Sequence, residues 1–122
     1  MKVSELHNQK GFTLIEIMIA ISIIAIALLG LVSVTVMVIK GNTFSKTMTV
    51  ATTLANDKME QLKKTSYASL ASGSDTAQSI YSRTWTVTQD SPAAGMKTGV
   101  VTVQWAWQGA TRTVTVRSII AQ

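Results

Sequence analysis

The sequence predicts an α+β protein in which one long N-terminal helix packs on a small three-stranded antiparallel sheet. An apolar run occupies most of the first third of the chain, and alternating strand patterns separated by turn residues occupy the last third. With 122 residues, the chain has room for one small domain beside such a helix.

The apolar run extends over 28 residues from Phe12 to Ile39 and is bounded by Lys10 and Lys40. A helix of this length measures roughly 42 Å, whereas the hydrocarbon core of a bilayer is about 30 Å thick. Backbone groups in lipid must be hydrogen-bonded within the segment, so we expect a helix despite the many β-branched residues. Within the run only Glu16 is ionisable, and a carboxylate inside a membrane segment is costly unless it has a role.

Beyond this run, apolar side chains recur at spacings of three and four residues, which predicts that the helix continues through Gly41 to Lys64. This stripe is expected to cover one face of the sheet. Its methionines are interpreted as core packing rather than as a cofactor site. The stripe comprises Phe44, Met48, Ala51, Ala55, Met59 and Leu62.

The last third of the chain predicts an antiparallel meander of three strands, in residues 83–88, 101–107 and around Val114 and Val116. Residues 65–82 are rich in small and hydroxyl side chains and predict a surface loop. The dipeptide Gln108-Gly109 predicts a tight hairpin turn. The face turned away from the helix is threonine-rich and solvated, and the free edges of the sheet are surfaces that a neighbouring subunit can cover.

The start of the apolar run carries a recognisable motif, because Lys10 to Glu16 read K-G-F-T-L-I-E. This sequence closely resembles the processing site of type IV pilins and pseudopilins. The resemblance implies that a prepilin peptidase cuts after Gly11 and that the new N-terminus, Phe12, is methylated. It also implies that Glu16, the fifth mature residue, helps the subunit to enter a helical filament. The alternative is an ordinary membrane anchor with a stray glutamate.

The resemblance divides the chain into a prepilin leader of residues 1–11, a transmembrane and filament-core helix of residues 12–40, and a globular head of residues 41–122. The leader lacks the apolar core that precedes the cleavage site of a secretory signal peptide. It carries two lysines and one glutamate, so its removal lowers the formal net charge from +5 to +4. This diffuse charge is far from the composition of a nucleic-acid-binding protein.

No catalytic constellation is evident, so the chain is not expected to be an enzyme. It has no cysteine, and its one histidine, His7, lies in the leader. Asp57 and Glu60 are three residues apart, but a hard cation needs six or more oxygen ligands, so we expect no metal and no cofactor. Asp75 and Asp90 lack the ligand spacing of a calcium loop.

Three tryptophans in the strand patterns raise the alternative of a DNA-uptake pilin, because bases stack on exposed aromatic rings. The alternation of the strands places Trp85, Trp105 and Trp107 on the buried face, which favours core packing instead. Nucleic acid is therefore not an expected partner.

The leading interpretation is a minor pilin-like structural subunit of a type IV pilus, serving motility, adhesion or the initiation of pilus assembly. The segment Leu54–Leu62 is similar to a segment of the V-type minor pilins and of the I-type pseudopilins of type II secretion. A type II secretion pseudopilin is therefore the alternative, and a monomeric membrane-anchored adhesin is a remote one.

This interpretation also implies partners and a location. The expected partners are other pilin or pseudopilin subunits, the prepilin peptidase, the inner-membrane assembly platform and membrane lipid. Before assembly the subunit is expected to be a single-pass inner-membrane protein. After assembly it is expected in a periplasmic pseudopilus or in a pilus at the cell surface.

Overall fold

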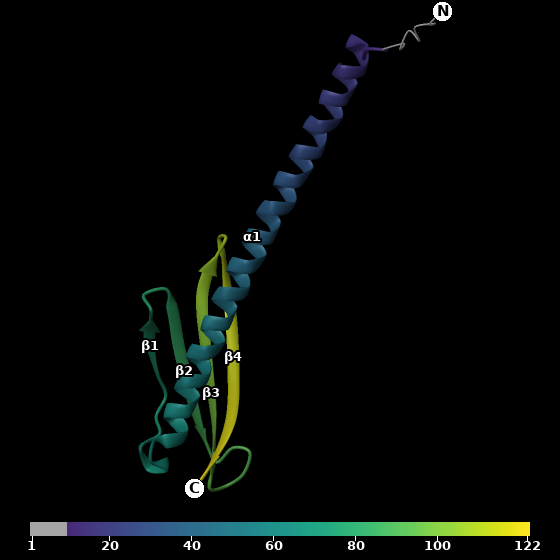
Figure 1. Ribbon diagram of the computed structural model, residues 1–122. Helices are drawn as coiled ribbons and strands as arrows, with labels where there is room; N and C mark the ends of the chain where they lie inside the picture. Colours follow the sequence, from purple (N-terminus) through teal and green to yellow (C-terminus); the bar gives the residue numbers. More distant parts are fainter. Residues whose placement is uncertain (1–9) are drawn as a thin grey trace, which may run out of the picture. The chain divides into compact units, whose positions relative to one another are not determined.

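The computed structural model describes residues 10–122, and the chain divides into two compact units between Lys40 and Gly41. His7 and the first nine residues of the expected leader lie outside the described residues. The first element is the helix α1, Leu14–Lys64, which begins two residues after the expected start and passes through Gly41 without a break. The other described elements are the short 3-10 helix η1, Tyr67–Ser69, and strands β1 to β4 (Figure 1).

The N-terminal unit exposes all of its described side chains, from Lys10 to Lys40. Three hydroxyl residues interrupt its apolar surface, and each donates a hydrogen bond of 2.8–3.1 Å to the carbonyl four residues earlier in the helix. Such internal bonds remove the cost of placing a hydroxyl in lipid. Among residues 10–122, α1 is long and apolar enough to span a membrane, judged by its length and composition. The three hydroxyl residues are Ser22, Ser33 and Thr35.

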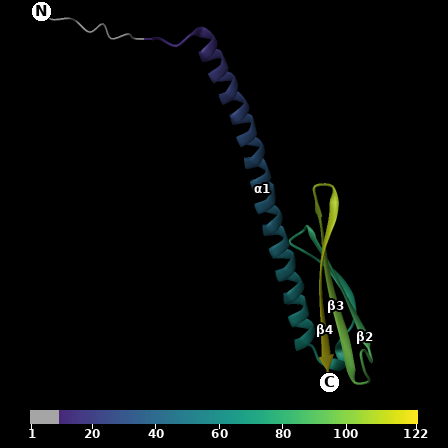
Figure 2. The same cartoon turned by 90° about the vertical axis from the view of Figure 1, so that its right-hand side faces the viewer.

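In the second unit, residues 41–64 of α1 lie along one face of the sheet (Figures 1 and 2). The expected stripe is largely confirmed, because four of its members are buried and Phe44 is half-buried. Met48 is an exception, since it is 41% exposed. Its neighbour Thr47 is half-buried in its place. The carbonyl of Thr47 accepts a hydrogen bond of 3.4 Å from the Tyr81 hydroxyl. Both residues satisfy the three-to-four spacing, so only the packing distinguishes them. The buried members are Ala51, Ala55, Met59 and Leu62.

The sheet has four described strands rather than the three expected. They are β1 Gly73–Ala77, β2 Tyr81–Gln89, β3 Met96–Trp107 and β4 Ala110–Ala121. They lie in the order β1-β2-β3-β4, and every neighbouring pair is antiparallel. The three expected strands correspond to β2, β3 and β4, so the architecture of a long helix on an antiparallel sheet is confirmed.

The additional strand β1 corrects the prediction that residues 65–82 form only a loop. Its sequence, G-S-D-T-A, has no apolar alternation, so strand periodicity cannot reveal it. The strand is held by its neighbour, because Asp75 lies opposite Arg83 in the register and the two side chains form an ion pair. The ring of Trp85 also packs on Gly73, where an added Cβ would lie 2.7 Å from the ring.

The face of the sheet that α1 covers carries the core. Val101, Val103 and Trp105 of β3 are 0–3% exposed. Residues directly opposite in an antiparallel pair share a face, which places Trp85 beside Val101 on this face. Trp107 is half-buried on the same face, with its ring centroid 5.7 Å from that of Phe44. The prediction that the three tryptophans share the buried face is confirmed.

The opposite face is polar and threonine-rich, as expected. One row of hydroxyls crosses the whole sheet, because the paired residues of successive strands are Ser74, Thr84, Thr102 and Thr115. At one end of the sheet, Gln108 and Gly109 have φ values of 50° and 78° and connect β3 to β4. Positive φ at both central residues is the signature of the tight hairpin that the sequence predicts.

Candidate functional site

The residues of the sequence motif lie at the start of α1. Lys10 to Thr13 precede the helix and have no regular secondary structure, so the bond between Gly11 and Phe12 lies two residues before the helix begins. Apart from its chain neighbours, no atom of residues 10–122 lies within 4 Å of the position of a Cβ at Gly11. An enzyme can therefore approach the backbone at this bond without unwinding a helix.

Thr13 sets the point at which the helix begins. Its hydroxyl accepts a hydrogen bond of 3.3 Å from the backbone N–H of Glu16. Its carbonyl accepts bonds of 3.1 and 3.2 Å from the N–H groups of Glu16 and Ile17. Thr13 is thus the N-cap, and the spacing Thr13-x-x-Glu16 is that of a capping box. The sequence signal for this cap is a threonine followed three residues later by a glutamate, directly before the apolar run.

Phe12 and the first helical turns form an apolar surface beside the motif. A shallow groove of about 340 Å³ is lined by Phe12, Glu16, Ile17, Ala20 and Ile21. Phe12 precedes the N-cap and Ile17 is the fourth helical residue, which are the two positions of a hydrophobic staple. The aromatic ring is 80% exposed in the single chain. An apolar segment of a partner, or lipid, can therefore cover both the ring and the groove.

Glu16 is the charged residue that lines this groove. It lies in the first turn of α1, where the positive end of the helix dipole favours a carboxylate. No side chain among residues 10–122 forms an ion pair with it. Its neighbours in the groove are apolar, so its carboxylate is available to a cation supplied from outside the chain.

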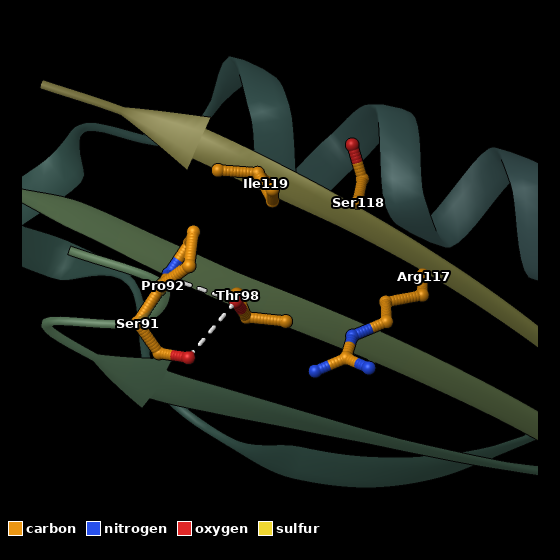
Figure 3. A pocket seen from close by; sticks show the side chains of 6 residues that line it. All are labelled: Ser91, Pro92, Thr98, Arg117, Ser118 and Ile119. Carbon is orange, nitrogen blue, oxygen red and sulfur yellow. Dashed lines mark hydrogen bonds between the residues drawn. The ribbon is translucent and has the colours of Figure 1, made fainter.

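The head carries a second groove on its threonine-rich face, with a volume of about 460 Å³. Figure 3 shows Arg117 and Thr98 on neighbouring strands, with Ser91 and Pro92 from the β2–β3 connection. The Thr98 hydroxyl donates a hydrogen bond of 2.8 Å to the Ser91 carbonyl, which fastens this connection to β3. The lining residues include no acid, histidine or cysteine, so this groove offers neither a general base nor a metal ligand set.

The two aspartates considered for a calcium loop are used within the fold. Both carboxylate oxygens of Asp75 accept hydrogen bonds from Arg83, at 2.7 and 2.6 Å. This hydrogen bonding lowers the pKa of Asp75 below its ordinary value. Asp90 accepts a weak bond of 3.4 Å from the backbone N–H of Gly95. Within residues 10–122 there is no group of three or more histidine, cysteine, aspartate or glutamate side chains that could hold a metal ion.

The comparisons with known proteins point to the same end of the chain. Residues 6–32 match the family model described as the prokaryotic N-terminal methylation motif. This motif is the signature of type IV pilins and pseudopilins, and it indicates a structural subunit that is cleaved and methylated. It implies assembly with other pilin subunits, and with the apolar helix it indicates membrane anchoring before assembly. Comparison with curated proteins and with solved structures finds no match.

Proposed function

We propose that this chain is a minor pilin-like structural subunit of a type IV pilus. The prepilin peptidase cuts it after Gly11 and the new N-terminal residue, Phe12, is methylated. The apolar helix anchors the subunit in the inner membrane before assembly, and the assembly platform then moves the subunit into a filament. The observation that carries this proposal is the arrangement at the start of α1, where an accessible peptide bond is followed by a capped helix whose Glu16 carboxylate forms no ion pair with residues 10–122.

Cleavage after Gly11 would create a cation close to that carboxylate. The amine of Phe12 would stand one residue before the N-cap, and a methylated amine keeps its positive charge. In a filament the apolar helices pack together, and an unpaired carboxylate among them costs several kcal/mol. We propose that Glu16 pairs with the Phe12 amine of an adjacent subunit, and that this pair sets the axial register of the filament.

The first experiment measures the mass and the N-terminal residue of the protein from membranes and from sheared surface filaments. The proposal expects a chain that begins with methylated Phe12 in the filament fraction. Gly11→Leu replaces the bare backbone before the cut by a bulky side chain, and this variant should remain uncut in the membrane. An intact chain confined to membranes, in cells with an active prepilin peptidase, would favour the plain anchor and overturn the proposal.

A second experiment separates the charge of Glu16 from its place in the capping box. Glu16→Gln keeps a side chain that can serve in the capping box but removes the charge, whereas Glu16→Asp keeps the charge. The proposal expects Glu16→Gln to be cleaved normally and lost from filaments, and Glu16→Asp to retain part of its assembly. Filament entry of Glu16→Gln at the wild-type level would show that no ion pair sets the register.

The type II secretion pseudopilin is the second candidate, because the Leu54–Leu62 segment is similar to a segment of the I-type pseudopilins as well as of the V-type minor pilins. Two strains distinguish the two machines: the first lacks the pilus assembly ATPase, and the second lacks this chain. Loss of the sheared filament fraction in the first strain supports the pilus subunit. Loss of secreted enzymes on deletion of this chain, with pili intact, supports the pseudopilin.

A further inference from the structure

The sheet has two open edges, and they differ in length. β1 and β4 are the outer strands of the order β1-β2-β3-β4, so each has one side without a strand partner among the described residues (Figure 1). β1 has five residues, whereas β4 has twelve and pairs with β3 without interruption from Ala110 to Ala121. Natural edge strands are often blunted by proline, by charged side chains (lysine above all) or by a bulge; β4 has no proline, lysine or bulge, and its charged residues are Arg112 and Arg117. Its free side is therefore a surface suited to another strand.

The directions of the two edges allow identical copies to join. Each step from β1 to β4 is antiparallel, and with three such steps β1 runs antiparallel to β4. The β1 strand of a second copy can therefore lie beside β4 and continue the same antiparallel pattern. This contact joins the β4 edge of one head to the β1 edge of the next, and both heads keep the same orientation.

Pairing between two β4 strands would have a different geometry. A two-fold contact requires β4 to pair with an antiparallel copy of itself, which reverses the second head relative to the first. Copies anchored in one membrane by the same N-terminal segment enter it in the same direction. The head-to-tail contact keeps every head in one orientation, which is compatible with the anchoring of all copies in one membrane.

Charge indicates how the two edges align. Asp75 is the acid of β1, and Arg112 of β4 lies on the same helix-covered face, opposite Trp105. No carboxylate among residues 10–122 forms an ion pair with Arg112. Asp75 is paired with Arg83, yet its side chain remains 36% exposed at the free edge, and a carboxylate has acceptor sites for a second guanidinium. Placing Asp75 opposite Arg112 also aligns Ser74 with Thr113 on the hydroxyl face.

We propose that the heads of neighbouring copies join head to tail, with β1 of one copy paired to β4 of the next and Asp75 facing Arg112. The occupant of each edge is thus a second copy of this chain. Because β1 has only five residues, the contact is weak between free molecules and forms when anchoring holds the copies at high local concentration. The contact needs membrane anchoring but not cleavage after Gly11.

The absence of cysteine from the chain makes a disulfide test simple. Ser74→Cys and Thr113→Cys are introduced together into the full chain, and membranes are treated with a mild oxidant. Cysteines opposite each other on neighbouring strands lie close enough for a disulfide. The proposal expects a ladder of covalent multimers, whereas each single variant gives none and the two single variants expressed together give one heterodimer. Thr86→Cys with Thr113→Cys is the matched control, because Thr86 lies on the same face in β2, away from the edge.

The register is scanned by combining Ser74→Cys with cysteine at Thr111, Thr113 or Thr115, which lie on the same face of β4. Absence of a ladder above the control in all three pairs would overturn the proposal. Dimers from a single cysteine in β4 would instead show the two-fold contact and would also overturn it. Repeating the test in a Gly11→Leu background separates this contact from processing, because the ladder should persist in the uncut chain.

The proposed contact between Asp75 and Arg112 is tested by changing the arginines of β4. Arg112→Gln should reduce the yield of the ladder several-fold, and Arg112→Lys should restore part of it. Arg117→Gln changes the next arginine of β4, which lies on the opposite face, and should leave the yield unchanged. Equal losses from Arg112→Gln and Arg117→Gln would overturn the assignment of Arg112 as the partner of Asp75.

Discussion

The two halves of α1 share one backbone conformation but have opposite surfaces. From Leu14 to Lys40 every side chain is exposed, including long rows of isoleucine and valine. From Gly41 to Lys64 the helix is mostly polar, and its buried stripe contacts the sheet, with Ala51 and Ala55 at 0% exposure. The second half packs on the sheet, whereas no residue among 10–122 covers the first half.

This difference explains how one helix can serve two purposes. Apolar area removed from water contributes roughly 25 cal/mol per Å², so the bare first half strongly favours lipid or the helices of other subunits. Small alanines let the second half approach the sheet closely, and its outward face remains polar enough for water. Changes in the second half should therefore affect the stability of the head, and changes in the first half should affect anchoring and assembly.

The largest expected effect comes from the centre of the head. Trp105 is 3% exposed and its ring centroid lies 5.9 Å from that of Tyr81. Trp105→Ala should lower the free energy of unfolding of the head by about 3–5 kcal/mol, because it leaves a large cavity. Urea unfolding of the full chain in detergent, followed by tryptophan fluorescence, measures this change, since all three tryptophans lie in the head.

Trp105→Phe is the matched control for that variant. The indole N–H of Trp105 is buried without a hydrogen-bond partner among the described residues. Replacing the indole by a phenyl ring removes this unpaired donor, which offsets part of the lost packing, so the cost should be less than about 2 kcal/mol. Equal losses from the alanine and phenylalanine variants would show that the N–H has a partner.

A pair of identical substitutions tests the contrast between the halves directly. Ala55→Leu places three more carbons between α1 and the sheet and should destabilise the head by about 1–3 kcal/mol. Ala27→Leu makes the same change on the exposed first half, so the urea midpoint of the head should not move. A comparable loss from Ala27→Leu would mean that the first half also supports the head.

Replacing a glycine by alanine should change stability in opposite directions in the two units. At Gly73 an added Cβ would lie 2.7 Å from the Trp85 ring, so Gly73→Ala should cost about 1 kcal/mol in head stability. At Gly30 no described atom beyond the helix's own backbone lies within 4 Å of the Cβ position, so Gly30→Ala should stabilise the helix by about 0.5–1 kcal/mol. Circular dichroism on heating in detergent would report the second effect, and a loss of helicity would contradict it.

The smallest expected effect is a pH dependence of the head. The Arg83 hydrogen bond lowers the pKa of Asp75 below its ordinary value of 3.8, so the folded state binds this proton more weakly than the unfolded state. The resulting stabilisation is present above that ordinary value and is lost as the pH falls through the lowered pKa. Because the Asp75 side chain is 36% exposed, solvent screens the pair and the stabilisation amounts to less than about 1 kcal/mol.

The variant Asp75→Asn measures this contribution. The difference in urea midpoint between wild type and Asp75→Asn should be largest near about pH 7 and should shrink as the pH falls below about 4. A difference that stays constant over this range would show that the charge of Asp75 does not stabilise the head.

The sequence could predict those features that depend on neighbouring residues. The apolar run required a helix, the methylation motif marked its start, and Gln108-Gly109 supplied the positive φ values of the hairpin. The alternating pattern also placed the three tryptophans on one face of the sheet. Each of these features follows from short-range geometry, namely the helical period, the strand period and the steric freedom of glycine.

The tertiary structure decided what depends on contacts across the chain. β1 exists because Arg83 and Trp85 of the next strand hold Asp75 and Gly73, and its own sequence has no strand pattern. Thr47 rather than Met48 faces the sheet because the helical period permits either residue, and only packing against Tyr81 selects one. The two open edges follow from the order of the strands, since strand order depends on long-range pairing that local preferences do not encode.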